Sequence, residues 1–165
     1  MDDIIGRTFA AILIVATILV GVALFLNTAD SNIQTKIKDD SVSFVDSCRG
    51  LGKITPDLIY SYLQKVGACG EFEATVTVER QNAYYDDVND KVSHTTSFVL
   101  MPELLDRIFA TGGNQDYVLR TGDRISVKVT RTGAGFTAML GFIGRGGQNG
   151  DLITEYGGLV LHDGR

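Results

Sequence analysis

Two cysteines are the residues of this 165-residue chain whose placement most directly suggests chemistry. Cys48 lies at the end of a predicted long helix, and Cys69 follows a predicted second helix. If an αα-hairpin brings the thiols together, a disulfide closes a loop of about 20 residues and stabilises the fold by roughly 3 kcal/mol. Such a bond indicates an oxidising, extracytoplasmic compartment. The alternative is two reduced, buried thiols.

Neither histidine is placed like a catalytic base. His94 lies in the polar stretch SHTTS, which is typical of an exposed strand, and His162 lies three residues from the C-terminus. Two cysteines and two distant histidines lack the ligand spacing of a zinc site. The sequence contains no HExxH, GxSxG or kinase-type motif. We therefore expect no enzyme and no cofactor, with a hydrolase head as a minor alternative.

Two segments are candidate ligand-binding loops. The acidic cluster of Asp86, Asp87, Asn89 and Asp90 could offer oxygen ligands to Ca²⁺, although it departs from the EF-hand pattern. The glycine-rich segment GGQNG at residues 146–150 lacks the Lys-Ser/Thr pair of a phosphate-binding loop, so we expect a surface loop there. The net charge of −5, with scattered basic residues, gives no nucleic-acid footprint.

The elements that position the cysteines, histidines and acidic residues follow an unbroken apolar run near the N-terminus, at residues 9–26. No charged side chain occurs between Arg7 and Asp30, and about 20 such residues can cross a hydrocarbon core roughly 30 Å thick. The run could be a cleaved signal peptide, a membrane anchor or the assembly segment of a filament. Asp2 and Asp3 offset Arg7, and no small-x-small site follows Leu26, which disfavours a signal peptide.

The apolar run continues into a second helical segment. Residues 28–49 contain no Pro or Gly, and Ile33, Ile37, Phe44 and Cys48 form a narrow apolar stripe. The pattern predicts one helix over residues 9–48, roughly 60 Å long at 1.5 Å per residue. This helical segment is assigned to residues 9–50. Residues 9–26 would form the membrane or filament part, and residues 27–49 the amphipathic part. Gly50 and Gly52 are expected to end the helix.

Residues 51–165 predict a single α+β head. A helix is expected over residues 54–66, with Thr55 as its cap, Pro56 at its first position and Gly67 closing it. Its expected buried face is Leu58, Ile59, Tyr62, Leu63 and Val66.

Strict alternation of apolar and polar residues predicts strands at residues 71–80 and 123–131. A poorer strand at residues 92–100 is expected to pair with the first. A short helix at residues 102–109 and a last strand at residues 152–162, interrupted at Gly157 and Gly158, complete the head. The fold class is therefore α+β, with a long N-terminal hydrophobic helix packed on a small antiparallel sheet.

This layout resembles type IV pilins in the broad sense, and more closely the TadE-like and related pilin-like proteins of Tad or conjugation loci. The resemblance is carried by the short polar leader at residues 1–8, the long helix, the segment GKITPD at residues 52–57 and the order of the strands. It implies a membrane-held precursor that is cut after a small residue, here Gly6, before Arg7. Family members usually carry a Glu five residues into the mature helix, where this chain has Ala11.

The resemblance implies a structural subunit of an extracellular filament, held in a membrane before assembly. Its partners would be further copies of the chain and a pilus assembly machinery. Small residues within the apolar run would let neighbouring helices approach closely. The residues expected to assemble are Phe9, Ala10, Ala11, Ile14, Thr17, Ile18, Gly21, Leu24 and Phe25. The alternative is a monomeric, membrane-anchored binding module at the cell surface.

Overall fold

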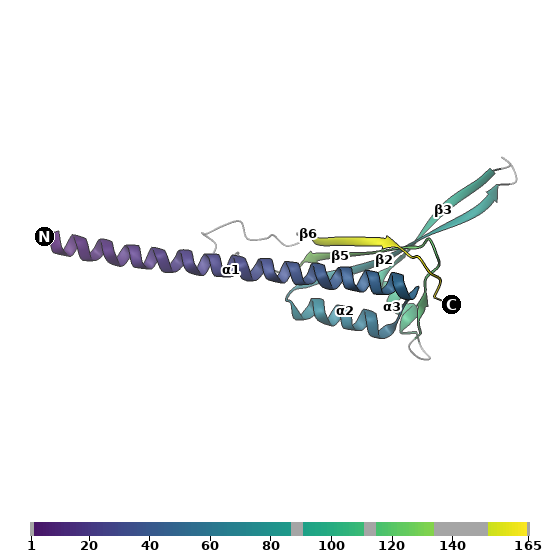
Figure 1. The fold of residues 1–165 in the computed structure, drawn as a ribbon, viewed down its shortest axis with the longest axis horizontal. Helices are drawn as coiled ribbons and strands as arrows, with labels where there is room; N and C mark the ends of the chain where they lie inside the picture. The colour runs from purple at the N-terminus through teal and green to yellow at the C-terminus, as the bar shows by residue number, and fades with distance from the viewer. Residues whose placement is uncertain (1, 87–90, 111–114, 134–151, 165) are drawn as a thin grey trace.

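The computed structural model describes residues 2–86, 91–110, 115–133 and 152–164. It consists of a long N-terminal helix, α1 (Asp2–Leu51), and a head that packs on the second half of that helix, while the first half extends away as a stalk (Figure 1). The predicted α+β class, a long apolar helix with a small antiparallel sheet, is confirmed.

The end of α1 is set by Gly52 and not by Gly50. Gly50 remains in the helix, whereas Gly52 adopts a φ of +65°, which is strained for residues with a side chain. A Cβ at Gly52 would collide with the backbone carbonyl of His162. The reversal after α1 therefore requires glycine both for its conformation and for the close approach of the C-terminal tail.

The second helix, α2 (Pro56–Ala68), begins as predicted. The Thr55 hydroxyl accepts a hydrogen bond from the Leu58 amide at 3.2 Å, and Pro56 occupies the first turn. The helix does not close at Gly67 as expected but ends with Cys69 as its cap. Its buried residues are Ile59, Tyr62 and Val66, with Leu58 and Leu63 partly buried against the core.

Four antiparallel strands form the main sheet in the order β3-β2-β5-β6. Their bounds are β2 (Phe72–Asp86), β3 (Lys91–Leu100), β5 (Arg124–Arg131) and β6 (Leu152–Leu159). The predicted pairing of the strand at residues 92–100 with the first strand is confirmed, because β3 forms a hairpin with β2. A second, two-stranded sheet pairs β1 (Lys53–Ile54) with β4 (Tyr117–Val118), and α3 (Met101–Ile108) follows β3.

The last strand is not interrupted at its glycines. Gly157 and Gly158 pair with Ser126 and Ile125, and the irregularity in β6 instead lies opposite Val129 and Thr130. A Cβ at Gly158 would lie 2.7 Å from the guanidinium carbon of Arg49, so a side chain there would require Arg49 to shift. Arg49 Nε donates to the Leu159 carbonyl at 2.7 Å, which joins the end of α1 to this strand.

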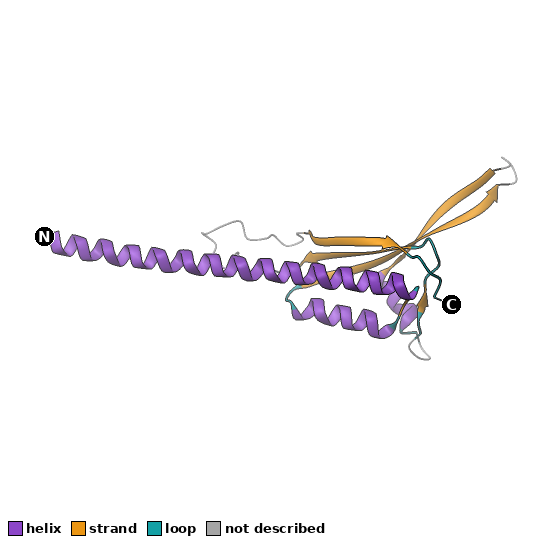
Figure 2. Cartoon of the chain, in the orientation of Figure 1, coloured by secondary structure: helices purple, strands orange, loops and turns teal. Residues whose placement is uncertain are grey.

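The core lies between the sheet and the two helices α1 and α2, which run side by side along it (Figure 2). Alternate residues of the strands point into this core, as the sequence pattern predicts. The largest fully buried side chains are Ile37, Val45, Ile54, Ile59, Val76, Val78, Leu104, Ile108, Leu119, Ile125, Val127 and Val129.

The hairpin of β2 and β3 extends past the rest of the sheet. Strand β5 pairs with β2 only from Phe72 to Glu79, whereas β3 pairs with β2 as far as Asp86. Residues 80–86 and 91–97 therefore form a two-stranded extension, which we call the free ribbon (Figure 1). It leans away from α1 at the end of the head opposite the stalk.

Candidate functional site

The candidate site is the apolar first half of α1. No residue of its most apolar 18-residue window is buried, and within the described chain α1 is the one helix whose length and composition suit a membrane span. A membrane anchor and a signal sequence both meet that description. All nine predicted assembly residues are exposed on this segment: Phe9, Ala10, Ala11, Ile14, Thr17, Ile18, Gly21, Leu24 and Phe25.

The polar groups of this segment are satisfied within the helix. The Thr17 hydroxyl donates to the Leu13 carbonyl at 2.8 Å, and the Thr28 hydroxyl donates to the Leu24 carbonyl at 2.9 Å. Gly21 has open space around the position of a Cβ. The segment therefore presents an apolar surface that suits lipid or a neighbouring helix, because neither of these two hydroxyls needs an outside partner.

A shallow groove runs along one face of this half. Its lining residues follow helical spacing and include the small residues Ala11 and Ala16; the others are Thr8, Ile12, Val15 and Leu19. The same face continues at spacings of three and four through Asp30, Ile33 and Ile37, which the head covers. The groove is thus the uncovered beginning of the stripe that the head occupies further along.

The predicted processing site lies on α1. The helix already includes Gly6 and Arg7, so the leader at residues 1–8 continues into the apolar segment without a break in the described backbone. The structure holds no observation on cleavage, and the site at Gly6 and Arg7 stays a prediction.

The stalk and head meet at a buried ion pair that sequence patterns did not reveal. The carboxylate of Asp30, the first charged residue after the apolar run, accepts from both terminal nitrogens of Arg131 at 2.6 and 3.2 Å. The Arg131 side chain is 3 % exposed, and its guanidinium lies 5.5 Å from the centre of the Phe72 ring. The pair ties the base of β5 to α1 where the exposed segment ends.

The predicted disulfide between Cys48 and Cys69 does not form. Both cysteines are free thiols, with Cys48 buried and Cys69 partly exposed. The helices do form a hairpin, but Tyr62 lies against Ser41 and Lys65 against Asp40. Cys69 is therefore level with about residue 35 of α1, and at 1.5 Å per residue it lies about 20 Å along the helix from Cys48. A disulfide needs Cα atoms within about 7 Å.

Since both thiols are free, the cysteines give no support for an extracytoplasmic head. Burial raises the pKa of the Cys48 thiol to about 12, because the apolar core disfavours the thiolate. Cys48 consequently behaves as a small core residue and not as a nucleophile.

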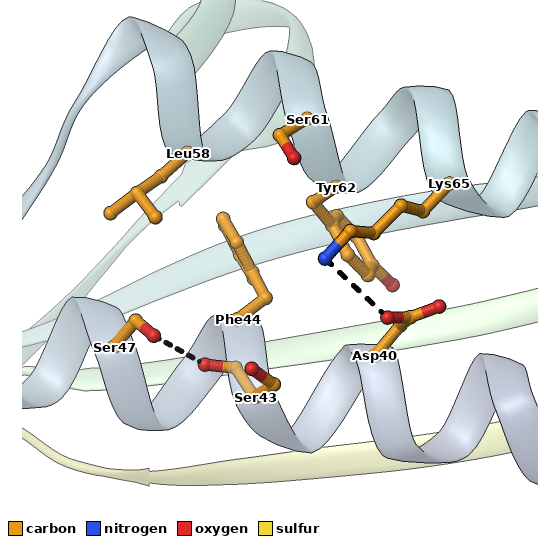
Figure 3. A pocket seen from close by; sticks show the side chains of 8 residues that line it. All are labelled: Asp40, Ser43, Phe44, Ser47, Leu58, Ser61, Tyr62 and Lys65. Carbon is orange, nitrogen blue, oxygen red and sulfur yellow. Dashed lines mark hydrogen bonds and ion pairs between the residues drawn. The ribbon is translucent and has the colours of Figure 1, made fainter.

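A small polar cleft lies between α1 and α2 (Figure 3). Three serines, Ser43, Ser47 and Ser61, line it together with the Asp40–Lys65 ion pair, whose N–O distance is 3.6 Å. The cleft has a volume of about 50 Å³, whereas pockets for small molecules measure about 300 to 1,000 Å³. It therefore has room for water but not for an organic substrate.

The floor of this cleft is a stack of two rings. Phe44 and Tyr62 lie with their centroids 4.5 Å apart and their planes at 18°. The Tyr62 hydroxyl is 3.0 Å from that of Ser41, and burial raises the Tyr62 pKa to about 12. Tyr62 stays protonated at neutral pH, so this hydrogen bond joins the helices and does not prepare a base.

The remaining ligand predictions fall partly outside the described residues. Of the acidic cluster, Asp87, Asn89 and Asp90 lie outside the described residues, and Asp86 ends β2. The segment 146–150 also lies outside the described residues. His94 and His162 are both exposed. Within residues 2–86, 91–110, 115–133 and 152–164, no group of three or more metal-binding side chains occurs.

Comparisons with known protein families, with curated proteins and with solved structures find no match for this chain.

Proposed function

We propose that this chain is a structural subunit of an extracellular, type IV pilus-like filament that assembles through the apolar half of α1. The observation that carries the proposal is that this half is uncovered, yet continues without a break into the half that the head grips. In a filament, the uncovered groove would be filled by the helix of another copy. Since lipid is as apolar as these side chains, the gain on leaving a membrane would come from close helix packing at the small residues Ala11 and Ala16.

The pilin-like resemblance adds the expected pathway. The chain would first be held in a membrane through residues 9–26, then leave it as the helices bundle, with the heads facing solvent. Gly6 and Arg7 are the candidate processing position, and an assembly machinery of the pilus type would be required. Ala11, where related pilins usually carry Glu, lines the groove and would favour close packing over a charged helix contact.

The second candidate is a monomeric, membrane-anchored binding module at the cell surface. The same exposed segment supports it, because its length matches one crossing of a bilayer. The two functions differ in whether the apolar half contacts other copies or only lipid.

A pair of groove variants separates them. Ala11→Phe fills the groove but keeps the segment apolar, so it should leave membrane association intact and abolish fibres. Leu13→Phe adds the same ring to an exposed position that does not line the groove, and should keep fibres. The measurement is electron microscopy of fibres sheared from cells, together with membrane fractionation.

The outcome also decides the alternative. If wild-type chains extracted in detergent remain monomeric and cells carry no fibres of this chain, the filament function is lost and the anchored module stands. If Ala11→Phe assembles as well as Leu13→Phe, the groove is not the helix contact.

A further inference from the structure

The free ribbon has an open hydrogen-bonding edge. Strand β3 is the last strand on its side of the sheet, and in the described chain no strand pairs with its outer edge. From Val92 to Leu100 it contains no Lys, Arg, Asp or Glu. Proteins usually protect such edges with charges, prolines or bulges, because an uncharged edge pairs readily with another chain.

The outward face of β3 carries three exposed apolar residues. Val92, Phe98 and Leu100 project to the face opposite the core-facing Val99 and are 62 %, 59 % and 54 % exposed, with His94 and Thr96 between Val92 and Phe98 on the same face. Val92 lies in the free ribbon, and Phe98 and Leu100 follow it in the same strand. A two-stranded ribbon without a third strand is marginally stable in water. A further strand beside β3 would therefore stabilise the ribbon and cover apolar surface.

The opposite edge of the same sheet offers a strand of the required direction. Because the four strands are all antiparallel, β6 at the far edge runs opposite to β3. Two copies with the same orientation can therefore place β3 of one beside β6 of the other as an antiparallel pair. The new hydrogen bonds would run along residues 152–158, because the Leu159 carbonyl already accepts from Arg49. Leu159 on β6 is 55 % exposed and would lie on the apolar side of this pair.

The strands also define the offset that such copies need. The position of each strand along the sheet can be given by the β2 residue that it lies across from. Strand β6, counted through β5, lies across from Glu73 to Glu79, whereas the free ribbon includes β2 residues 80–86. A shift of about six residues, or about 20 Å, aligns most of the ribbon with β6, and an even number keeps the core-facing sides of the two sheets on the same face. It places Val92 opposite Leu159 and Phe98 opposite Leu152. Strands β5 and β6 run alongside α1, so the shift lies along the stalk (Figure 1).

We propose that the free ribbon of one copy adds as a strand to β6 of a second copy, which is displaced outward along α1 by about 20 Å. The contact is heterologous and repeats from copy to copy without closing, as a helical assembly requires. The inference rests on the proposed filament function, because a filament supplies copies of equal orientation that are staggered along its axis.

Pairing of β3 with β3 is the competing arrangement. Antiparallel pairing of β3 from one copy with β3 from a second copy requires a two-fold axis between them, so the two ribbons would point in opposite directions. The stalks, which extend from the opposite end of each head, would then point away from one another, unlike subunits of one filament or anchors in one membrane.

The test places the photo-crosslinking amino acid p-benzoylphenylalanine at Phe98 of the full-length chain. Isotopically labelled and unlabelled copies are co-expressed, and filaments are irradiated and digested for mass spectrometry. We expect cross-links from position 98 to residues 152–159 of another copy. Within one copy β3 and β6 are separated by two strands, or about 14 Å, so an internal cross-link is not expected.

The matched control places the same amino acid at Tyr60, an exposed aromatic residue of α2, and should give no cross-link to β6. Thr96→Lys adds a charge to the edge and should lower the cross-link yield about tenfold. Thr132→Lys adds the same charge at an exposed position outside the ribbon and should leave the yield unchanged.

The outcomes separate this inference from the proposed function. Filaments in which position 98 cross-links to β3, to another segment or to nothing overturn the strand addition and leave the filament function standing. Cross-links to β6 among chains that form no filament support the strand addition and remove the filament function. If neither filaments nor cross-links form, both are overturned.

Discussion

At the scale of single residues, the ion pair of Asp30 and Arg131 determines how the stalk is fixed to the head. Both charges are removed from water, and each is satisfied mainly by the other. Breaking such a pair by removing one partner is costly because the remaining charge stays buried, whereas replacing both by apolar residues is often nearly neutral.

This predicts the stability of the variants. Asp30→Ala should lower the free energy of unfolding by about 3 to 5 kcal/mol, because Arg131 is left buried without its partner. The double variant Asp30→Leu, Arg131→Met should recover most of that loss. Urea unfolding in detergent measures both. A double variant as unstable as Asp30→Ala would contradict this account of the pair.

Two buried acids predict how stability depends on pH. Burial raises the pKa of both Cys48 and Tyr62 to about 12 in the folded protein, whereas in an unfolded chain the two groups ionise near 8.5 and 10. The folded state thus holds these protons more tightly, and its stability is complete below about pH 8.5 and is lost as the pH rises toward 12.

We therefore expect the melting temperature to fall between pH 9 and pH 11. The double variant Cys48→Val, Tyr62→Phe should fall less over this range, since neither side chain titrates. Thermal melting followed by circular dichroism at several pH values provides the measurement. Equal losses in both proteins would show that other groups cause the alkaline effect.

At the scale of elements, the connection between α1 and α2 depends on one glycine. Gly52 has a positive φ, and its Cα faces the backbone of the C-terminal tail, so an added methyl group has no flexible side chain to displace. Gly67 lies inside α2 with open space around it.

The two glycines give a matched prediction. Gly52→Ala should destabilise the head by at least 1 to 2 kcal/mol, the approximate cost of a left-handed residue with a side chain. Gly67→Ala should stabilise it by about 0.5 to 1 kcal/mol, since alanine favours a helix. Chemical unfolding of both variants tests this, and a stable Gly52→Ala protein would contradict the described turn.

Sequence patterns predicted most elements but not all of their ends. The alternation around Val76 and Val127 and the capping by Thr55 are local, so they identify strands and a helix without knowledge of the fold. The length of β2 was missed, because none of the ribbon side chains whose burial the structure describes is buried, so no alternating pattern is imposed there. Strands β1 and β4 were missed because two-residue strands carry no periodicity.

At the scale of the whole molecule, the stalk and the head are built differently. The first half of α1 contributes nothing to the core, whose residues along α1 begin at Ile33 and Ile37, just after the Asp30 contact. The head therefore contains its own core within residues 28–165 of the chain.

This predicts that a fragment starting at Thr28 folds without the apolar half. It should be monomeric and free of detergent, and it should melt within a few degrees of the full chain. Size-exclusion chromatography and calorimetry measure these properties. Aggregation of the fragment would show that the stalk protects part of the head, whereas fibres of the fragment would show that assembly does not need the apolar half of α1.

The prediction of a disulfide between Cys48 and Cys69 is wrong because it ignores the register of the two helices. A hairpin brings together residues at equal distances from its turn, and Cys48 lies four residues before Gly52 whereas Cys69 lies 17 after it. That asymmetry was a usable signal. The bonds from Arg131 to Asp30 and from Arg49 to the Leu159 carbonyl, by contrast, join residues 101 and 110 apart in the sequence, and no local pattern indicates them.

The sequence by itself determined the apolar segment, the long helix, the capped second helix and the alternating strands, because each depends on neighbouring residues and a fixed period. Only the tertiary structure decided that the two thiols stay apart, that Asp30 and Arg131 join stalk to head, and that β3 extends past the sheet with an open edge. Those features depend on how distant segments are aligned in space, and the packing of the core fixes that alignment.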